Sequence, residues 1–106
     1  MLNTIESAGM RNGEVAKVFE RIGDLLEIDG ADRFRVNSYR KVARALDDAS
    51  EDVVALAAEG RLDELPGVGK SSAERIAQFL KTGHVDVLDE LEAKLPKGLP
   101  DLLFIQ

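Results

Sequence analysis

Residues 62–76 combine the residue types with which a protein can hold a phosphate group through its main chain. Their sequence is Leu-Asp-Glu-Leu-Pro-Gly-Val-Gly-Lys-Ser-Ser-Ala-Glu-Arg-Ile. Pro66 suits the entry to a turn, and Gly67 and Gly69 can adopt positive φ and let another backbone approach closely. We expect a short helical turn, a tight bend, and a second helix that begins near Lys70.

Such a bend directs unpaired main-chain N–H groups to one point outside the protein. The first amides of a helix lack intrahelical partners and lie at the positive end of its dipole, so an anion such as phosphate is a natural ligand. Lys70 adds a full charge, and Val68 is expected to point inward. The predicted phosphate-contacting residues are Gly67, Val68, Gly69, Lys70, Ser71 and Arg75. The alternative interpretation is a turn that only joins two packed helices.

The elements around this segment predict an all-α fold, a compact bundle of five to six short helices. Apolar residues recur at helical spacing, and no stretch alternates convincingly with period two. Helices are expected over about 14–28 and 32–48, between Ser50 and Gly60, on both sides of the bend, and over about 85–95. Asn12 and Ser50 are candidate N-caps, and Phe34 is expected to be buried.

Length, composition and charge limit the possible classes of protein. A chain of 106 residues without cysteine makes one small domain and has no disulfide or thiolate metal site. The apolar stretches are too short for a membrane span, and no targeting signal is visible, so we expect a cytoplasmic monomer. The net charge is −6, but residues 32–44 carry five basic side chains and one acidic. This distribution favours a positive face over an acidic body, although solvated helix faces would also explain it.

The segment at about 62–80 resembles a helix-hairpin-helix motif, and the resemblance extends over about residues 12–105. Phe34-Arg-Val-Asn-Ser-Tyr-Arg-Lys-Val-Ala-Arg44 and Phe79-Leu-Lys-Thr-Gly-His84 stand where the amino-terminal domain of family X DNA polymerases has them. In DNA polymerase beta this is the lyase domain, and residues 14–28 resemble the bacterial members most. The resemblance implies one domain over 1–106, excised from a longer polymerase ahead of a second helix-hairpin-helix.

The resemblance also argues against catalysis by this fragment. The family's lyase lysine attacks the sugar aldehyde of a 5′-deoxyribose phosphate, and Arg75 stands at its position. A guanidinium stays protonated and has no free lone pair for that attack. Ser71 matches another lysine of the pocket. Lys70 and Lys41 remain alternative nucleophiles for a residual lyase activity.

By the same resemblance, Arg35 and Tyr39 match residues of the family's 5′-phosphate pocket, and Arg40 is included with them. Arg40, Lys41 and Arg44 are expected to continue a basic stripe, or to pair with acidic residues of their own helix. The family's hairpins often hold a monovalent cation, Na⁺ or K⁺. Here its ligands would be the backbone carbonyls of Asp63, Leu65 and Val68, and no other cofactor is expected.

The resulting hypothesis is a DNA-binding module of a family X polymerase that acts in base excision repair. It would hold the sugar–phosphate backbone and the 5′-phosphate of gapped or nicked DNA without reading base sequence, beside the other domains of its polymerase. The alternatives are the residual lyase and a protein-interaction domain that uses its acidic body or the apolar tail at 99–105.

Overall fold

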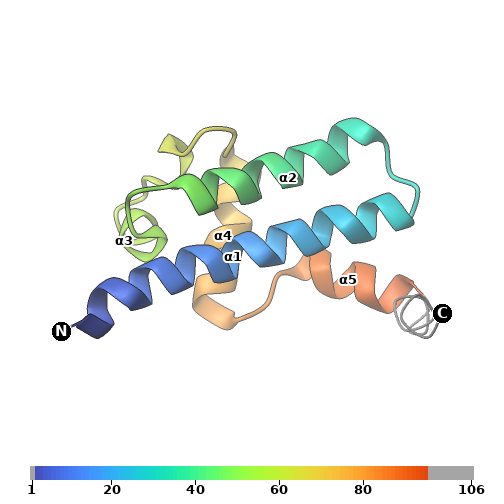
Figure 1. The fold of residues 1–106 in the computed structure, drawn as a ribbon. Coiled ribbons are helices and arrows are strands. Elements are labelled where there is room, and N and C mark those ends of the chain that lie inside the picture. Colours follow the sequence, from blue (N-terminus) through green and yellow to red (C-terminus); the bar gives the residue numbers. More distant parts are fainter. Residues whose placement is uncertain (1, 96–106) are drawn as a thin grey trace.

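The computed structural model describes the backbone of residues 2–95 and the side chains of residues 11–95. This part of the chain contains helices and no strand (Figure 1). Its elements are α1 (Leu2–Ile28), α2 (Arg33–Asp48), α3 (Val53–Ala58), the 3₁₀ turn η1 (Leu62–Glu64), α4 (Lys70–Thr82) and α5 (Asp86–Lys94). The all-α fold and the expected number of helices are confirmed. The apolar tail at 99–105 lies outside the described residues.

Helices α1 and α2 lie side by side, antiparallel, and form the main interface of the bundle (Figure 1). The chain reverses between them through Gly30, which has φ 87°. The carboxylate of Asp32 then caps α2 by accepting a hydrogen bond of 2.9 Å from the N–H of Arg35. Apolar side chains at helical spacing fill the interface, among them Phe19, Ile22, Leu26, Val42 and Leu46.

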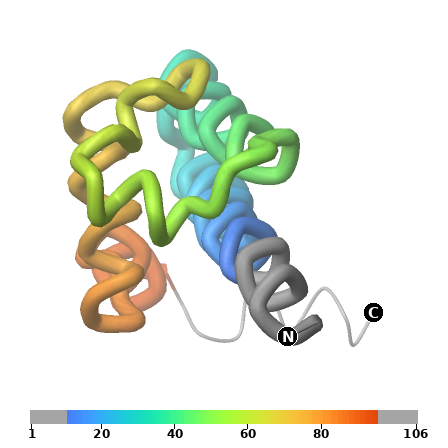
Figure 2. Tube along the Cα trace, turned by 90° about the vertical axis from the view of Figure 1, so that its left-hand side faces the viewer, coloured from blue at the N-terminus to red at the C-terminus, as the bar shows by residue number. Residues whose placement is uncertain are grey.

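The chain from α3 to α4 forms a second layer beside the α1–α2 pair (Figure 2). Leu62 and Leu65 enter the core from η1 and the residue after it, and Ile76 enters it from α4. Helix α5 packs against α1, and two ion pairs cross the contact, Arg21–Glu92 at 2.8 Å and Lys94–Asp29 at 2.9 Å. Residues 62–76 are thereby fixed on a core supplied mainly by α1 and α2.

Both N-caps proposed from the sequence were wrong. Helix α1 begins at Leu2, so Asn12 lies inside it, and α3 is capped by Asp52 rather than Ser50. The Asp52 carboxylate accepts from the N–H of Val54 at 3.0 Å. Asn12 instead joins two elements: its amide donates to the carbonyl of Glu51 at 2.9 Å and accepts from the N–H of Val53 at 2.9 Å.

The predicted burial of Phe34 was also wrong, since its side chain is 86% exposed. Phe34 is the second residue of α2, one position before Arg35 and two before the buried Val36. Adjacent residues of a helix point in different directions, so the face that buries Val36 leaves Phe34 outside. None of the described helices is long and apolar enough to cross a membrane.

Replacing Asn12 with alanine should lower the free energy of unfolding by about 1–3 kcal/mol, because it leaves the buried N–H of Val53 without an acceptor. Asn37→Ala, on the exposed face of α2, is the matched control and should be close to neutral. Urea unfolding followed by circular dichroism compares the two. Equal stabilities for the two variants would show that the Asn12 bridge contributes nothing.

Candidate functional site

The bend between η1 and α4 is held by one buried side chain and one glycine. Val68 is 5% exposed, so it points inward as expected, and its N–H donates to the carbonyl of Leu65 at 3.1 Å. Gly67 has φ 79°, a conformation that favours glycine strongly. A rigid turn therefore leads the chain into α4.

Gly69 has a different role from the one expected of it. Its φ of −94° and ψ of −169° are extended, so this position does not use positive φ. Gly69 is instead the N-cap of α4, and no side chain makes a capping hydrogen bond there. Its carbonyl accepts the N–H of Ala73 at 2.9 Å, which closes the first turn. The first amides of α4 are therefore left open to a ligand.

A cleft of about 340 Å³ lies between the first half of α2 and the start of α4. It brings together four residues named from the sequence, Arg35 and Tyr39 on α2 with Ser71 and Arg75 on α4. Ser38 and Ser72 also line it and were not singled out from the sequence, since neither was matched to a residue of the family's pocket. The two arginines thus approach the same space from different helices.

Tyr39 links this cleft to the core. Its ring is 9% exposed and packs against Phe19, with centroids 5.8 Å apart and ring planes tilted by 32°. The Arg75 guanidinium lies 6.0 Å from the centroid of the Tyr39 ring, at the limit of a cation–π contact. Arg75 also donates a hydrogen bond of 3.3 Å to the carbonyl of Ser71. A buried ring therefore positions a half-buried cation.

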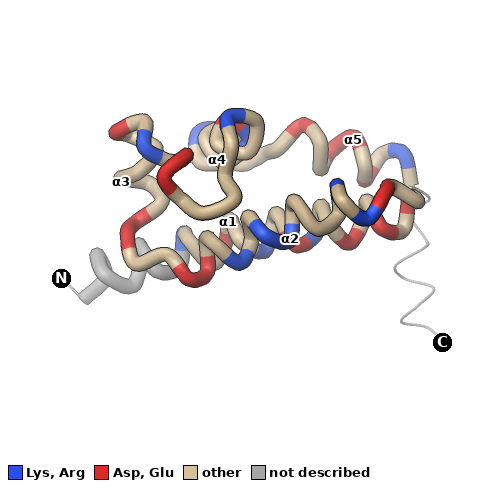
Figure 3. The backbone as a smooth tube through the Cα atoms, turned by 90° about the horizontal axis from the view of Figure 1, so that it is seen from above, with Lys and Arg blue, Asp and Glu red and all other residues tan. Residues whose placement is uncertain are grey.

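Basic residues lie on several elements of the described chain (Figure 3), and the ion pairs divide them into two groups. In the described part of the chain, the paired group is bound by the protein's own carboxylates and consists of Arg11, Arg21, Arg40, Arg61 and Lys94. No ion pair forms at the basic residues beside the start of α4, which are Arg35, Lys41, Arg44, Lys70 and Arg75. Lys17, Arg33 and Lys81 also form no ion pair, so the residues beside the start of α4 hold most, but not all, of the unpaired positive charge among residues 11–95.

Comparison with known sequences agrees with this geometry. Residues 10–85 match the sequence model of a family described as the helix-hairpin-helix domain. The chain belongs to the helix-hairpin-helix domain family. The matched residues include η1, the bend at 66–69 and α4.

One protein with a similar sequence is a DNA polymerase. The domain is 29% identical over 94 residues to the DNA polymerase/3′-5′ exonuclease PolX of Bacillus subtilis (strain 168). The match covers 89% of this chain and 16% of that protein, so the chain spans about a sixth of the relative's length. The resemblance to a helix-hairpin-helix domain of a bacterial family X polymerase is confirmed.

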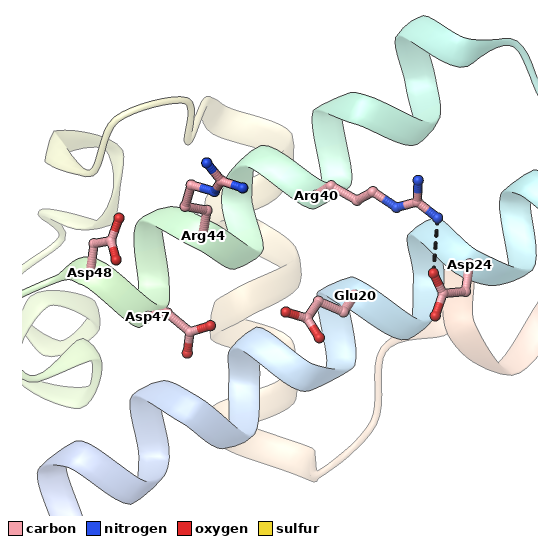
Figure 4. Close-up of a pocket in the computed structure, with 6 residues that line it drawn as sticks. All are labelled: Glu20, Asp24, Arg40, Arg44, Asp47 and Asp48. Carbon is pink, nitrogen blue, oxygen red and sulfur yellow. Dashed lines mark hydrogen bonds and ion pairs between the residues drawn. The ribbon is translucent and has the colours of Figure 1, made fainter.

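The domain does not bring Arg40 into the cleft with Arg35 and Tyr39. The Arg40 guanidinium crosses to α1 and donates to Asp24 at 2.9 Å and Glu27 at 2.7 Å (Figure 4 shows the first of these bonds). These bonds raise the pKa of Arg40. The carboxylates thus belong to α1, and not to Arg40's own helix.

Arg61 holds the entry to the hairpin. Its guanidinium bonds to Glu59 at 2.6 Å and Glu64 at 2.9 Å, and approaches Glu51 at 3.3 Å. The bond from Arg61 lowers the pKa of Glu64, and the bonds to Glu64 and Glu59 raise that of Arg61. The network joins the start and end of α3 to η1 at the surface.

The predicted cation site uses main-chain carbonyls rather than side chains. Residues 11–95 contain no group of three or more His, Asp or Glu side chains that could hold a metal ion. The carbonyls of Asp63, Leu65 and Val68 are the proposed ligands for Na⁺ or K⁺, and that of Leu65 already accepts one hydrogen bond from Val68. A carbonyl oxygen has a second lone pair, so this hydrogen bond leaves the Leu65 carbonyl able to accept a cation. The cation site stays a prediction.

Proposed function

We propose that this domain binds the sugar–phosphate backbone of DNA without regard to base sequence. The observation that supports this most is the open N-terminus of α4, preceded by a glycine N-cap and flanked by Lys41 and Lys70 without ion-pair partners. Main-chain amides and lysines contact phosphate oxygens, which carry no base information. The net charge of −6 implies modest affinity, and few phosphate contacts imply release of about two to four counterions.

The cleft of Arg35, Tyr39, Ser71 and Arg75 is proposed to hold a 5′-terminal phosphate at a gap or nick. Two guanidinium groups supply charge and forked donors that match phosphate oxygens. The cleft is next to the first amides of α4, because Ser71 and Ser72 line it. A DNA strand whose 5′-end lies in the cleft would therefore contact the hairpin with its next phosphates.

We propose binding rather than lyase chemistry for this cleft. Neither Lys41 nor Lys70 is among the residues that line it, and the lyase lysine's position is Arg75. Arg75 is held by the Ser71 carbonyl and the Tyr39 ring, and its guanidinium is no nucleophile. The parent protein is proposed to be a family X polymerase, in which this domain holds the downstream end of a short gap.

Gly69→Asp is the sharpest test of backbone binding. An aspartate at an N-cap accepts hydrogen bonds from the same amides that would bind phosphate, and its charge repels the anion. We expect unchanged or slightly higher thermal stability, since aspartate is a better cap than glycine by a few tenths of a kcal/mol. Affinity for gapped DNA, measured by fluorescence anisotropy at low salt, should fall about tenfold or more.

Gly69→Asn separates the two effects of that variant, because asparagine caps equally well without charge. It should lose less affinity than the aspartate variant. Nothing lies within 4 Å of a Cβ built at Gly69, so neither variant should distort the fold. Full DNA affinity in a stably folded Gly69→Asp domain would exclude the open amides as the binding site.

Arg35→Ala tests the 5′-phosphate cleft. The wild-type domain should bind gapped DNA more tightly with a 5′-phosphate than with a 5′-hydroxyl, and this preference should fall about tenfold in the variant because a charged hydrogen bond is lost. Arg33→Ala is the matched control, since Arg33 lies on the same turn of α2 and does not line the cleft. Equal losses in both variants would point to general attraction instead of a phosphate pocket.

Phe34, at the rim of this cleft, is proposed to stack on an unpaired base of the gap. A ring that is 86% exposed beside a phosphate site offers a flat apolar surface, and base stacking contributes about 1–3 kcal/mol. Phe34→Leu should weaken binding to a gap about tenfold and to a nick much less, whereas Phe34→Trp should keep the preference. Loss of the same size on both DNAs would contradict stacking.

A further inference from the structure

A second cleft continues the first along α2. It has a volume of about 390 Å³ and lies between the second half of α2 and the hairpin turn. Lys41 and Arg44 line it from α2, Leu65 and Gly67 line it from the turn, and Ala45 contributes to its apolar wall. Since Gly67 borders this cleft and Ser71 borders the first, the start of α4 lies between the two.

The two basic residues of the second cleft have no internal partner among the described residues. Arg44 lies next to Asp47 and Asp48, yet Figure 4 draws no interaction from its guanidinium to either. Lys41 also forms no ion pair, and its Cβ lies 3.8 Å from the position of a Cβ built at Gly67. Its stem is thus set against the hairpin turn while its ammonium group stays in solvent.

The distance between the basic residues along α2 is similar to the length of a short DNA segment. Arg35 and Arg44 are nine positions apart, which corresponds to about 13 Å at 1.5 Å per residue. A duplex advances about 3.4 Å along its axis per nucleotide of one strand, so a duplex that lies parallel to α2 covers about four nucleotides over this length. Asp48 lines the far end of the second cleft and presents a negative charge there.

We infer that α2 carries a phosphate track of about four nucleotides for the strand whose 5′-end is held by Arg35 and Arg75. The strand passes the amides of α4 and continues over Lys41 and Arg44, and the carboxylate of Asp48 ends the track by repelling the next phosphate. The inference rests on the proposed function, because it assigns the direction and length of the same DNA contact. Lys41 and Arg44 are then binding residues in their own right.

Substituting single phosphates with neutral methylphosphonate linkages tests the track. Gapped DNA is prepared with one such linkage at each of the first eight positions of the 5′-phosphorylated downstream strand, and binding is measured by anisotropy. For the wild-type domain, we expect weaker binding for linkages within about the first four nucleotides and no effect beyond them. Lys41→Gln combined with Arg44→Gln should abolish the effect at the third and fourth linkages and keep the 5′-phosphate preference.

The same double variant should bind unmodified DNA about tenfold more weakly, with a salt slope lower by about two. Lys17→Gln combined with Lys81→Gln is the matched control, since it changes net charge equally with exposed residues that line neither cleft. Asp48→Asn should strengthen binding about threefold and extend the sensitive stretch. All the residues changed are exposed, so thermal stability should be unaffected.

The outcomes separate the track from the function on which it rests. If the Lys41 and Arg44 double variant keeps the wild-type linkage profile while Arg35→Ala still weakens binding, the track is wrong and the proposed function stands. If the wild-type domain binds no DNA at low salt, both are wrong. Equal losses in the double variant and its charge-matched control would also overturn the track, because position would then have no effect.

Discussion

The antiparallel contact of α1 with α2 is the constraint on which the candidate site depends. It fixes α2 beside the hairpin, so that Arg35 and Lys41 flank the start of α4 from a helix far from it in sequence. The contact is made by close-packed apolar side chains, whose positions are far better defined than those of surface charges. The phosphate-binding geometry is therefore supported by the core, and only its ligands are exposed.

The acidic composition of the chain and an anionic ligand are compatible because of where the carboxylates lie. Glutamates and aspartates on or beside α1, α3, η1 and α5 pair with Arg21, Arg40, Arg61 and Lys94, none of which lines the clefts beside the start of α4. Exposed pairs of this kind contribute little to stability individually. Their effect here is on the distribution of charge, since they neutralise basic groups outside the site.

Local patterns in the sequence were enough to predict the helices, the hairpin and the inward direction of Val68, because each depends on spacing and turn chemistry within one segment. The meeting of Arg35, Tyr39, Ser71 and Arg75 in one cleft was expected only through the family resemblance. Side chains that reach across elements could not be predicted: Asn12 forms hydrogen bonds about 40 positions away, and Arg40 pairs with α1. The burial of Phe34 was predicted wrongly because the type of an apolar residue near the start of a helix does not show whether it faces the core or the solvent.

The glycine at position 23 has a consequence for any attempt to stabilise α1. Alanine in a helix interior is normally favoured over glycine by about 1 kcal/mol, and Gly23 is buried with no positive φ to protect. Yet a methyl group there would lie 3.2 Å from Cγ of Arg40 and 3.6 Å from the carbonyl of Val36, so the overlying arginine stem would have to lift. The space above Gly23 is thus occupied by the stem of Arg40, and an alanine would push that stem by a few tenths of an ångström and strain its bonds to Asp24 and Glu27. A change made to strengthen one helix would in this way weaken the ion pairs that join it to its neighbour.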